Sequence, residues 1–375
     1  MRITGAVLRH APAEAPYADS RPLEVGPLEL AGPGPGELLV RVEAAGVCHS
    51  DLSVIDGNRL RPTPMLLGHE AAGVVEVVGD GVRDVAVGDH VVLVYVPSCG
   101  SCRFCSSGRP ALCAAAAGAN AAGDLVGGGS RLSHDGTEVR HHLGVSAFAT
   151  HAVVDRSSAV VVDRDVPLGT AALFGCAMLT GYGAVTRTAG VAPGESVAVF
   201  GLGGVGLAAV MGAAATGAWP VVAVDPVPEK QKLALEVGAS HACGPDELEA
   251  LAAEVAPDLF HWTFEAVGSA RVFEAAYAVT GRGGGTVSMG LPHPSATLQL
   301  PALSIVAENR RVLGSYMGSA QPAVDVPAMI GLWRAGRLPV DRLVSAEVAL
   351  DDVNAAMDEL AAGRAVRQVV RPHGT

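Results

Sequence analysis

The sequence is poor in positive charge, in aromatic side chains and in long apolar runs, and each shortage argues against a class of protein. It has 26 lysine and arginine residues against 38 aspartate and glutamate residues, and aromatic residues make up 4% of the chain. A nucleic-acid groove needs a basic surface with aromatic platforms, so DNA or RNA is not the expected partner. No stretch approaches the roughly 20 uninterrupted apolar residues that a membrane-spanning helix needs.

The first residues, MRITGAVLRH, lack the apolar core of a secretory signal, which predicts a cytoplasmic protein. In a reducing cytoplasm the seven cysteines serve metals more often than disulfides. The length of 375 residues exceeds that of one typical core and indicates two or three compact units.

Four cysteines lie close together with the spacing C-x2-C-x2-C-x7-C, at Cys99, Cys102, Cys105 and Cys113. Thiolates gathered this closely can converge on one tetrahedral zinc ion, and four thiolates leave no open position for chemistry. We therefore expect a structural zinc lobe at residues 97–115. Free buried thiols, disulfides and an iron–sulfur cluster are the alternatives, although the bacterial ferredoxin run has a shorter final gap and a proline after its fourth cysteine.

The first half of the chain is rich in β-branched runs bounded by glycine, proline and aspartate. Residues 38–48, 73–79 and 90–96 are expected strands, and few helices interrupt them. This pattern predicts a mostly β domain over residues 1–177. The glycine-rich segment 118–129 is expected to be a surface loop with positive φ angles.

The pattern changes to alternating strands and helices in the second half. SVAVF (196–200), a glycine-rich turn, an alanine-rich helix and VVAVD (221–225) form a strand–helix–strand unit. Further short strands predict a doubly wound α/β domain over residues 178–318. The tail, 319–375, contains a predicted helix at 351–363 and a final strand, and we expect it to return to the first domain.

The glycine-rich turn, Gly201-Leu202-Gly203-Gly204-Val205-Gly206, has the spacing G-x-G-x-x-G between a predicted strand and a predicted helix. Gly201 allows the tight turn, Gly203 lets the backbone approach a pyrophosphate, and Gly206 lets the helix pack on the strand. The helix N-terminus offers free N–H groups to the anion. The turn therefore predicts a dinucleotide site, and the alternative is a glycine turn without a ligand.

An acidic residue, Asp225, ends the next predicted strand 19 residues after Gly206. A carboxylate there can accept hydrogen bonds from the ribose diol of adenosine. It would repel a 2′-phosphate, and the following Pro226 and Val227 supply no arginine to offset the repulsion. The sequence therefore predicts NAD rather than NADP.

Two short clusters, CHSD at 48–51 and GHE at 68–70, contain ligands suited to zinc. Neither cluster is specific by itself. Cys48, His69 and Cys176 together make the two-thiolate, one-imidazole set of a catalytic zinc whose fourth position is left for water or substrate.

These segments resemble the zinc-dependent alcohol dehydrogenases of the medium-chain dehydrogenase/reductase superfamily over nearly the whole chain. The resemblance is carried by GVCHSD (46–51), GHE (68–70), the four-cysteine run, FGCAMLTGYGA (174–184), VFGLGGVG (199–206), VVAVD (221–225) and AVRQVV (365–370). It implies a GroES-like catalytic domain, a Rossmann domain, two zinc ions per chain, and hydride transfer between a zinc-bound alcohol and NAD(H).

The resemblance also implies individual roles. Glu70 lies beside the metal, Asp51 holds His69, and Ser50 is the first proton acceptor. Relatives continue the proton relay through a histidine at the position of Ser53, so here the proton leaves through water or His49. Positions that contact the cofactor in the family correspond here to His49, Thr180, Lys230 and Arg367. The alternative for the charged residues among them is that they are ordinary surface charges.

The family's substrate pocket corresponds to Ser50, Arg59, Tyr95, Gly118, His142, Leu143 and Met317, a more polar lining than that of ethanol-oxidising relatives. We expect a medium-sized alcohol, aldehyde or ketone with a polar or anionic group that meets Arg59 or His142. The alternative is that both side chains turn to solvent.

The stretch 133–154 resembles the longer arm of glutathione-dependent formaldehyde dehydrogenases. Where those enzymes place an acid and an arginine for glutathione, this chain has Arg59 and Ala117. A formaldehyde dehydrogenase dependent on a low-molecular-weight thiol remains the alternative within enzymes, and a non-catalytic zinc-stapled NAD-binding protein is the alternative outside them. The arm favours a homodimer over a homotetramer.

Overall fold

The computed structural model describes residues 1–374, which divide into two compact units. The first unit contains Met1–Cys176, Gln321–Pro327 and the C-terminal segment from Val344. The second contains Ala177–Ala320 and Ala328–Leu343. Residues 321–343 are thus divided between the two units, and each unit is described by itself.

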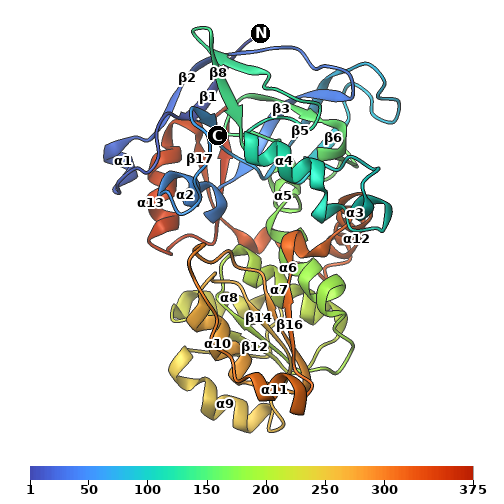
Figure 1. Ribbon diagram of the computed structural model, residues 1–375, viewed down its shortest axis with the longest axis vertical. Coiled ribbons are helices and arrows are strands. Elements are labelled where there is room, and N and C mark those ends of the chain that lie inside the picture. Colours follow the sequence, from blue (N-terminus) through green and yellow to red (C-terminus); the bar gives the residue numbers. More distant parts are fainter. Residues whose placement is uncertain (375) are drawn as a thin grey trace. The chain divides into compact units, whose positions relative to one another are not determined.

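The first unit contains a small closed barrel and a larger mixed sheet (Figure 1). The barrel strands, in the order β1-β2-β7-β8-β4, are β1 (Arg2–Leu8), β2 (Leu23–Leu30), β4 (Met65–Leu66), β7 (Leu132–His134) and β8 (Thr137–His141). Apolar side chains of these strands, such as Leu28, Leu66 and Val139, belong to one buried core cluster. Asp135 and Gly136 have positive φ angles in the tight turn between β7 and β8.

The larger sheet has seven strands, in the order β10-β6-β5-β3-β18-β17 with β9 also paired to β3. Its strands are β3 (Glu37–Gly46), β5 (Ala71–Val78), β6 (His90–Leu93), β9 (His151–Asp155), β10 (Ala159–Val162), β17 (Val344–Ala349) and β18 (Arg367–Arg371). The β-branched runs at 38–48, 73–79 and 90–96 therefore form strands, although these strands end earlier than predicted, at Gly46, Val78 and Leu93. The final strand β18 lies antiparallel to β3, with Val369 opposite Gly46.

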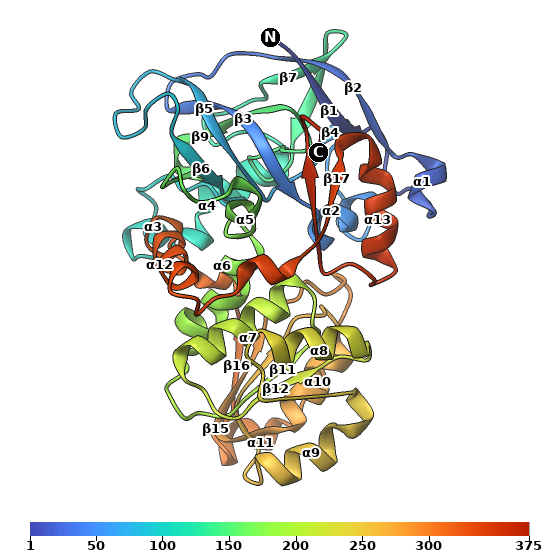
Figure 2. The same ribbon diagram turned by 180° about the vertical axis from the view of Figure 1, so that it is seen from behind.

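Short helices cover and connect these strands. They are α1 (Tyr17–Ser20), α2 (His49–Ile55), α3 (Arg103–Ser106), α4 (Ala114–Ala122), α5 (Leu168–Leu173) and α13 (Val353–Ala361). Helix α13 packs against α1 and β17 (Figure 2), and buries Val353, Met357 and Leu360 in the main core.

Helix α4 corrects one prediction. Residues 118–122 of the expected loop form its second half, and only Gly123 and the later glycines Gly128 and Gly129 have positive φ angles within the segment 118–129. Alanine, the strongest helix former, surrounds Gly118 on both sides and outweighs the cost of one glycine in the helix.

The second unit is built on a parallel sheet of six strands in the order β13-β12-β11-β14-β15-β16. The strands are β11 (Val197–Phe200), β12 (Val221–Val224), β13 (His241–Cys243), β14 (Phe260–Glu265), β15 (Thr280–Ser288) and β16 (Arg311–Gly314). Strands β11 and β12 are buried along their whole length, which explains their continuous apolar sequence. This order is that of a doubly wound dinucleotide fold, and the predicted fold class is confirmed.

The helices of the second unit are α6 (Ala177–Gly183), α7 (Gly204–Thr216), α8 (Pro228–Glu236), α9 (Leu248–Val255), α10 (Ala270–Ala278) and α11 (Ala302–Ala307). Helix α12 (Pro322–Arg334) begins in the first unit and ends in the second. Helices α7, α8 and α10 pack against the sheet (Figures 1 and 2). Across residues 1–374 we find no helix with the length and apolar character that crossing a bilayer requires.

Candidate metal centres and nucleotide turn

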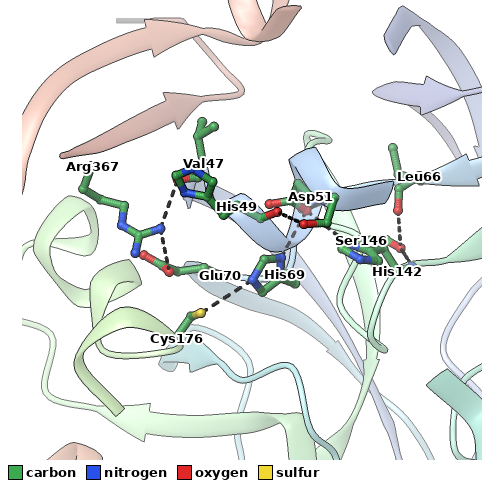
Figure 3. Close-up of polar contacts among 12 residues, drawn as sticks. Val47, His49, Asp51, Leu66, His69, Glu70, His142, Ser146, Cys176 and Arg367 are labelled. Atoms are coloured by element: carbon green, nitrogen blue, oxygen red, sulfur yellow. Dashed lines mark hydrogen bonds and ion pairs between the residues drawn. The ribbon is translucent and has the colours of Figure 1, made fainter. Parts of the chain in front are cut away.

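Three buried metal-ligating side chains meet in the first unit, although they are far apart in sequence. Cys48 precedes helix α2, His69 lies between β4 and β5, and Cys176 follows helix α5. One ligand atom from each lies within 4.8 Å of the others. Figure 3 shows His69 with Cys176 on one side of its ring and Asp51 on the other.

The spacing of these atoms fits zinc. The Cys176 Sγ atom lies 3.5 Å from Nε2 of His69. Tetrahedral zinc with Zn–S of about 2.3 Å and Zn–N of about 2.0–2.1 Å places two such atoms about 3.6 Å apart. Contact with Cys176 lowers the pKa of Cys48 well below its ordinary value, against the opposing effect of burial, which favours the thiolate form that binds metal.

Asp51 fixes the orientation of His69. Its Oδ1 atom accepts a hydrogen bond from the Gly68 N–H at 3.0 Å and lies 3.1 Å from Nδ1 of His69. Burial alone would raise the pKa of Asp51, but the adjacent histidines lower it to about 2. An ionised carboxylate can only accept, so Nδ1 carries the proton and the lone pair of Nε2 could bind a metal.

Glu70 and Arg367 lie behind the same cluster. The Arg367 Nη1 atom donates to the Val47 carbonyl at 3.0 Å and lies 3.5 Å from Oε2 of Glu70. Burial is the main cause that raises the pKa of Glu70 to about 7. A Cβ atom at Gly46 would stand 2.4 Å from Oε1 of Glu70, so glycine at that position makes room for the carboxyl group.

The four-cysteine run forms a second candidate metal centre. The ligand atoms of Cys99, Cys102, Cys105 and Cys113 lie within 4.8 Å of one another. The Sγ atoms of Cys102 and Cys105 are 3.6 Å apart, and backbone N–H groups donate to the sulfurs of Cys99 and Cys113 at 3.3 Å. All seven cysteines are free thiols, so the disulfide alternative is wrong for this structure. The donor set and its spacing fit a tetrahedral zinc ion.

In the second unit the backbone of the glycine-rich turn leaves no room for a side chain at two of its glycines. Gly201 has a φ of +87°, and a Cβ atom there would lie 2.5 Å from the side chain of Val267. A Cβ atom at Gly206 would lie 1.8 Å from the Gly201 carbonyl oxygen. A Cβ atom at Gly203 would meet nothing within 4 Å among residues 1–374, so this position opens on the space a pyrophosphate needs.

Asp225 connects this turn to the end of β12. Its Oδ2 atom accepts from the Leu202 N–H at 2.8 Å and its Oδ1 atom from the Val227 N–H at 2.9 Å. Each carboxylate oxygen has a second lone pair, so hydroxyl groups of a ribose can still be accepted. Lys230 lies half-buried in the first turn of α8.

The other predicted site residues fall into three groups. Ser50 is half-buried and His49 exposed in the first turn of α2, and the Ser53 hydroxyl donates to the His49 carbonyl at 2.8 Å. The rings of Tyr95 and His142 meet His69 edge to face, with ring centroids 5.5 and 5.4 Å away. The predicted residues elsewhere are Arg59 and Leu143 in loops of the first unit, exposed Gly118 in α4, and buried Thr180 and Met317 in the second unit.

Two contacts were not predicted from the sequence. His142, expected as pocket lining, also approaches Asp51, with Nδ1 3.0 Å from Oδ1. Arg367, expected at the cofactor, is paired with Glu70. Both contacts join residues far apart in the chain, and no local motif signals them.

Comparison with known proteins gives matches in both units. Residues 34–164 match the family "Alcohol dehydrogenase GroES-like domain", and residues 204–333 match the family "Zinc-binding dehydrogenase".

Among individual relatives, an NDMA-dependent alcohol dehydrogenase of Amycolatopsis methanolica is 38% identical over 359 residues, covering 94% of this chain and 96% of that protein. An S-(hydroxymethyl)glutathione dehydrogenase of Escherichia coli is 35% identical over 365 residues, covering 96% of this chain and 99% of that protein. The crystal structure of benzyl alcohol dehydrogenase from Acinetobacter calcoaceticus has a TM-score of 0.92 at 31% identity, with 99% of each chain covered. Because such matches extend over almost the whole chain, the protein belongs to the zinc-dependent alcohol dehydrogenases of the medium-chain dehydrogenase/reductase superfamily.

Proposed function

We propose that the protein transfers a hydride between the carbinol carbon of a small alcohol, or the matching aldehyde or ketone, and NAD(H). The observation that carries this proposal is the buried cluster of Cys48, His69 and Cys176, whose atoms lie at distances suited to one zinc ion with a fourth position left over. When bound, zinc supplies a Lewis acid for the alcohol oxygen, and the nicotinamide supplies the hydride acceptor.

The chain's own residues orient these groups and move the proton. Asp51 keeps the proton of His69 on Nδ1, so that Nε2 faces the two thiols. Ser50 is the proposed first acceptor of the hydroxyl proton, and its half-buried position lets the proton continue to water. Glu70 and Arg367 form a buried pair that balances charge behind the thiolates.

The direct test compares the two cysteine centres. Purified protein should contain two equivalents of zinc and form NADH with alcohols. Cys48→Ser should abolish turnover in a folded protein, whereas Cys102→Ser should mainly lower the temperature of unfolding, since a structural zinc contributes folding energy. A fully active Cys48→Ser protein would refute the catalytic assignment.

For the cofactor site, we propose that the turn Gly201–Gly206 holds the NAD pyrophosphate and that Asp225 binds the adenosine ribose. The open space at Gly203 and the position of Asp225 at the end of β12 support this assignment. Further contacts to the cofactor are proposed for His49, Thr180, Lys230 and Arg367.

The proposed substrate is a medium-sized primary or secondary alcohol, or its carbonyl counterpart, with a polar group that meets Arg59 or His142. Tyr95 and Leu143 would line the same pocket. Burial lowers the pKa of His142, which favours the neutral ring as a hydrogen-bond partner and leaves Arg59 as the group for an anion. Arg59→Leu should reduce selectivity for a polar substrate over its apolar analogue, because the variant lacks the guanidinium that would meet the polar group. Unchanged kcat/KM ratios would refute this role.

The second candidate activity is oxidation of formaldehyde adducts of a low-molecular-weight thiol. The similarity to an S-(hydroxymethyl)glutathione dehydrogenase favours it, whereas Arg59 and Ala117 do not suit glutathione. NADH formation with simple alcohols, compared with and without thiol and formaldehyde, distinguishes the two activities. Activity that requires both thiol and formaldehyde would replace the main proposal.

We further propose a cytoplasmic homodimer, rather than a homotetramer, without a nucleic-acid or membrane partner. The free thiols suit a reducing compartment. Strand β16 ends the parallel sheet, and its neighbour α11 exposes Leu303 and Val306, 76% and 81% accessible. An open strand edge beside apolar side chains is suited to pairing with a second copy across a two-fold axis.

A further inference from the structure

The carboxylate of Asp51 faces two imidazoles, not one. Nδ1 of His69 lies 3.1 Å and Nδ1 of His142 lies 3.0 Å from the same atom, Oδ1. All three side chains are at least 98% buried, and the two rings meet edge to face with an interplanar angle of 88°. Figure 3 shows His142 beyond Asp51, on the side away from Cys176.

Polar atoms without hydrogen bonds in this cluster indicate the role of His142. Oδ1 of Asp51 also accepts from the Gly68 N–H, whereas Oδ2 is buried and accepts no hydrogen bond from any of residues 1–374. Within the same residues, Nδ1 of His142 is likewise without an aligned hydrogen bond. Nδ1 of His142 therefore lies within hydrogen-bond distance, 3.0 Å, of Oδ1 in a carboxylate whose other oxygen is an unused acceptor. Because a carboxylate cannot donate, the proton belongs on Nδ1 of His142.

The backbone around His142 is built to hold the ring in this place. Its N–H donates to the Ser146 hydroxyl at 2.8 Å, and that hydroxyl donates to the Leu66 carbonyl at 2.8 Å. The turn includes Leu143, Gly144 and Ser146 with positive φ angles. Leu66 ends β4, three residues before His69, so the turn that carries His142 is tied to the segment that carries His69.

We propose that His142 is a positioning residue for the metal ligand His69, acting through the carboxylate of Asp51. The Nδ1–H group of His142 holds Asp51 from the side opposite His69, so the carboxylate cannot turn away from the ligand's own Nδ1–H. This inference rests on the proposed assignment of Cys48, His69 and Cys176 to zinc. It predicts that loss of Nδ1 at position 142 weakens zinc binding at that centre and leaves the four-cysteine centre unaffected.

The test measures zinc affinity in three variants of the full chain. His142→Asn keeps an N–H donor near the place of Nδ1, His142→Gln moves its amide towards the place of Nε2, and His142→Phe keeps a ring against His69 without a donor. Chelator competition followed by metal counting gives the affinity of the weaker centre, with the four-cysteine zinc as the internal reference. Loss of such outer hydrogen-bond partners typically costs about 10- to 100-fold in metal affinity.

We expect His142→Gln and His142→Phe to bind this zinc about 10-fold more weakly or worse, and His142→Asn to stay within about 3-fold of the wild type. His141→Gln is the matched control, because His141 is an adjacent buried histidine whose Nε2 accepts the Arg131 N–H and does not face Asp51. Wild-type affinity in His142→Phe, or equal losses in the Asn and Phe variants, would overturn the inference. An inactive wild type with this order of affinities would refute the proposed function and leave the role of His142 intact.

Discussion

Two buried carboxyl groups beside the same histidine have opposite pKa shifts, and their neighbours explain the difference. Asp51 faces a backbone N–H and two imidazoles, which together overcome the cost of burial and lower its pKa to about 2. Glu70 faces the Arg367 guanidinium at 3.5 Å, and neither of its oxygens accepts a hydrogen bond within residues 1–374, so burial prevails and raises its pKa to about 7. A buried charge is thus retained only where donors surround it.

At Asp225 a single charge is expected to set the cofactor preference. Asp225→Ser should raise the ratio of kcat/KM with NADP to that with NAD by at least about 10-fold, equivalent to about 1.4 kcal/mol, because the carboxylate repels a 2′-phosphate. Asp225→Asn is the control for shape, since it removes the charge and keeps an acceptor for the Leu202 N–H. Steady-state kinetics with both cofactors measures the ratio. A wild type that already prefers NADP contradicts the assignment.

His141 should make the first unit less stable in acid. Its ring is fully buried, and burial is the main cause that lowers its pKa from 6.5 to about 3. Between these pH values the unfolded chain binds a proton that the folded chain does not, so stability falls as the pH falls, by up to about 1.4 kcal/mol per pH unit. Above pH 6.5 this dependence disappears.

The substitution His141→Gln removes this proton and keeps an acceptor for the Arg131 N–H. Relative to the wild type, the variant should therefore gain about 1.5 kcal/mol in free energy of unfolding between pH 6.5 and pH 5. Urea unfolding followed by circular dichroism at several pH values measures the difference. Parallel curves for the two proteins would show that folding does not lower the pKa of His141.

At the scale of elements, the short helix α2 arranges much of the metal centre. Cys48 is its N-cap residue, and the Asp51 N–H donates to the Cys48 carbonyl at 3.0 Å. Residues three apart in a helical turn lie on one side of it, so one turn brings the thiol and the carboxylate to the same histidine.

In the turn between β11 and α7, one glycine is expected to affect mainly stability and another mainly NAD binding. Gly206→Ala should destabilise the second unit by about 2 kcal/mol or more, because the new methyl group would lie 1.8 Å from the Gly201 carbonyl oxygen. Gly203→Ala should change stability by less than about 1 kcal/mol, since its φ of −76° suits alanine and no described atom is near, yet it should weaken NAD binding about 10-fold or more.

Thermal unfolding and isothermal titration with NAD measure the two effects separately. The expected pattern is a loss of stability in the first variant and a loss of affinity in the second. NAD affinity unchanged by Gly203→Ala would place the pyrophosphate elsewhere.

At the scale of the whole molecule, the two kinds of site belong to different units. Both cysteine centres lie in the first unit, and the glycine-rich turn with Asp225 lies in the second. Each unit has its own apolar core, so each can position its groups by its own packing.

The proposed dimer gives a prediction at this scale. Val306→Asp should shift the protein from a dimer, of twice 37.9 kDa, towards monomers, because it places a charge among the exposed apolar side chains of α11. Val87→Asp is the control, since Val87 is also exposed, at 64%, but lies in the first unit. Sedimentation velocity measures the mass. A dimeric Val306→Asp protein would argue against an interface at α11.

The sequence by itself determined the features whose parts lie close together in the chain. The four cysteines span residues 99–113, and the strand, glycine turn, helix and Asp225 follow one another within one strand–helix–strand unit. Local geometry constrains such residues strongly, so spacing alone predicted the four-thiolate cluster and the doubly wound fold. The expected loop at 118–129 was wrong in its first half because helix propensity, not glycine content, decided the backbone there.

Only the tertiary structure decided which distant residues meet. Cys176 reaches His69, Arg367 reaches Glu70, and His142 reaches Asp51 through strand pairing and turns whose outcome no local pattern contains. The family resemblance identified Cys176 and Arg367 as site residues. It assigned Arg367 to the cofactor rather than to Glu70, and it predicted no contact between His142 and Asp51. The physical reason is that burial and packing select these contacts, and both act on the folded chain as a whole.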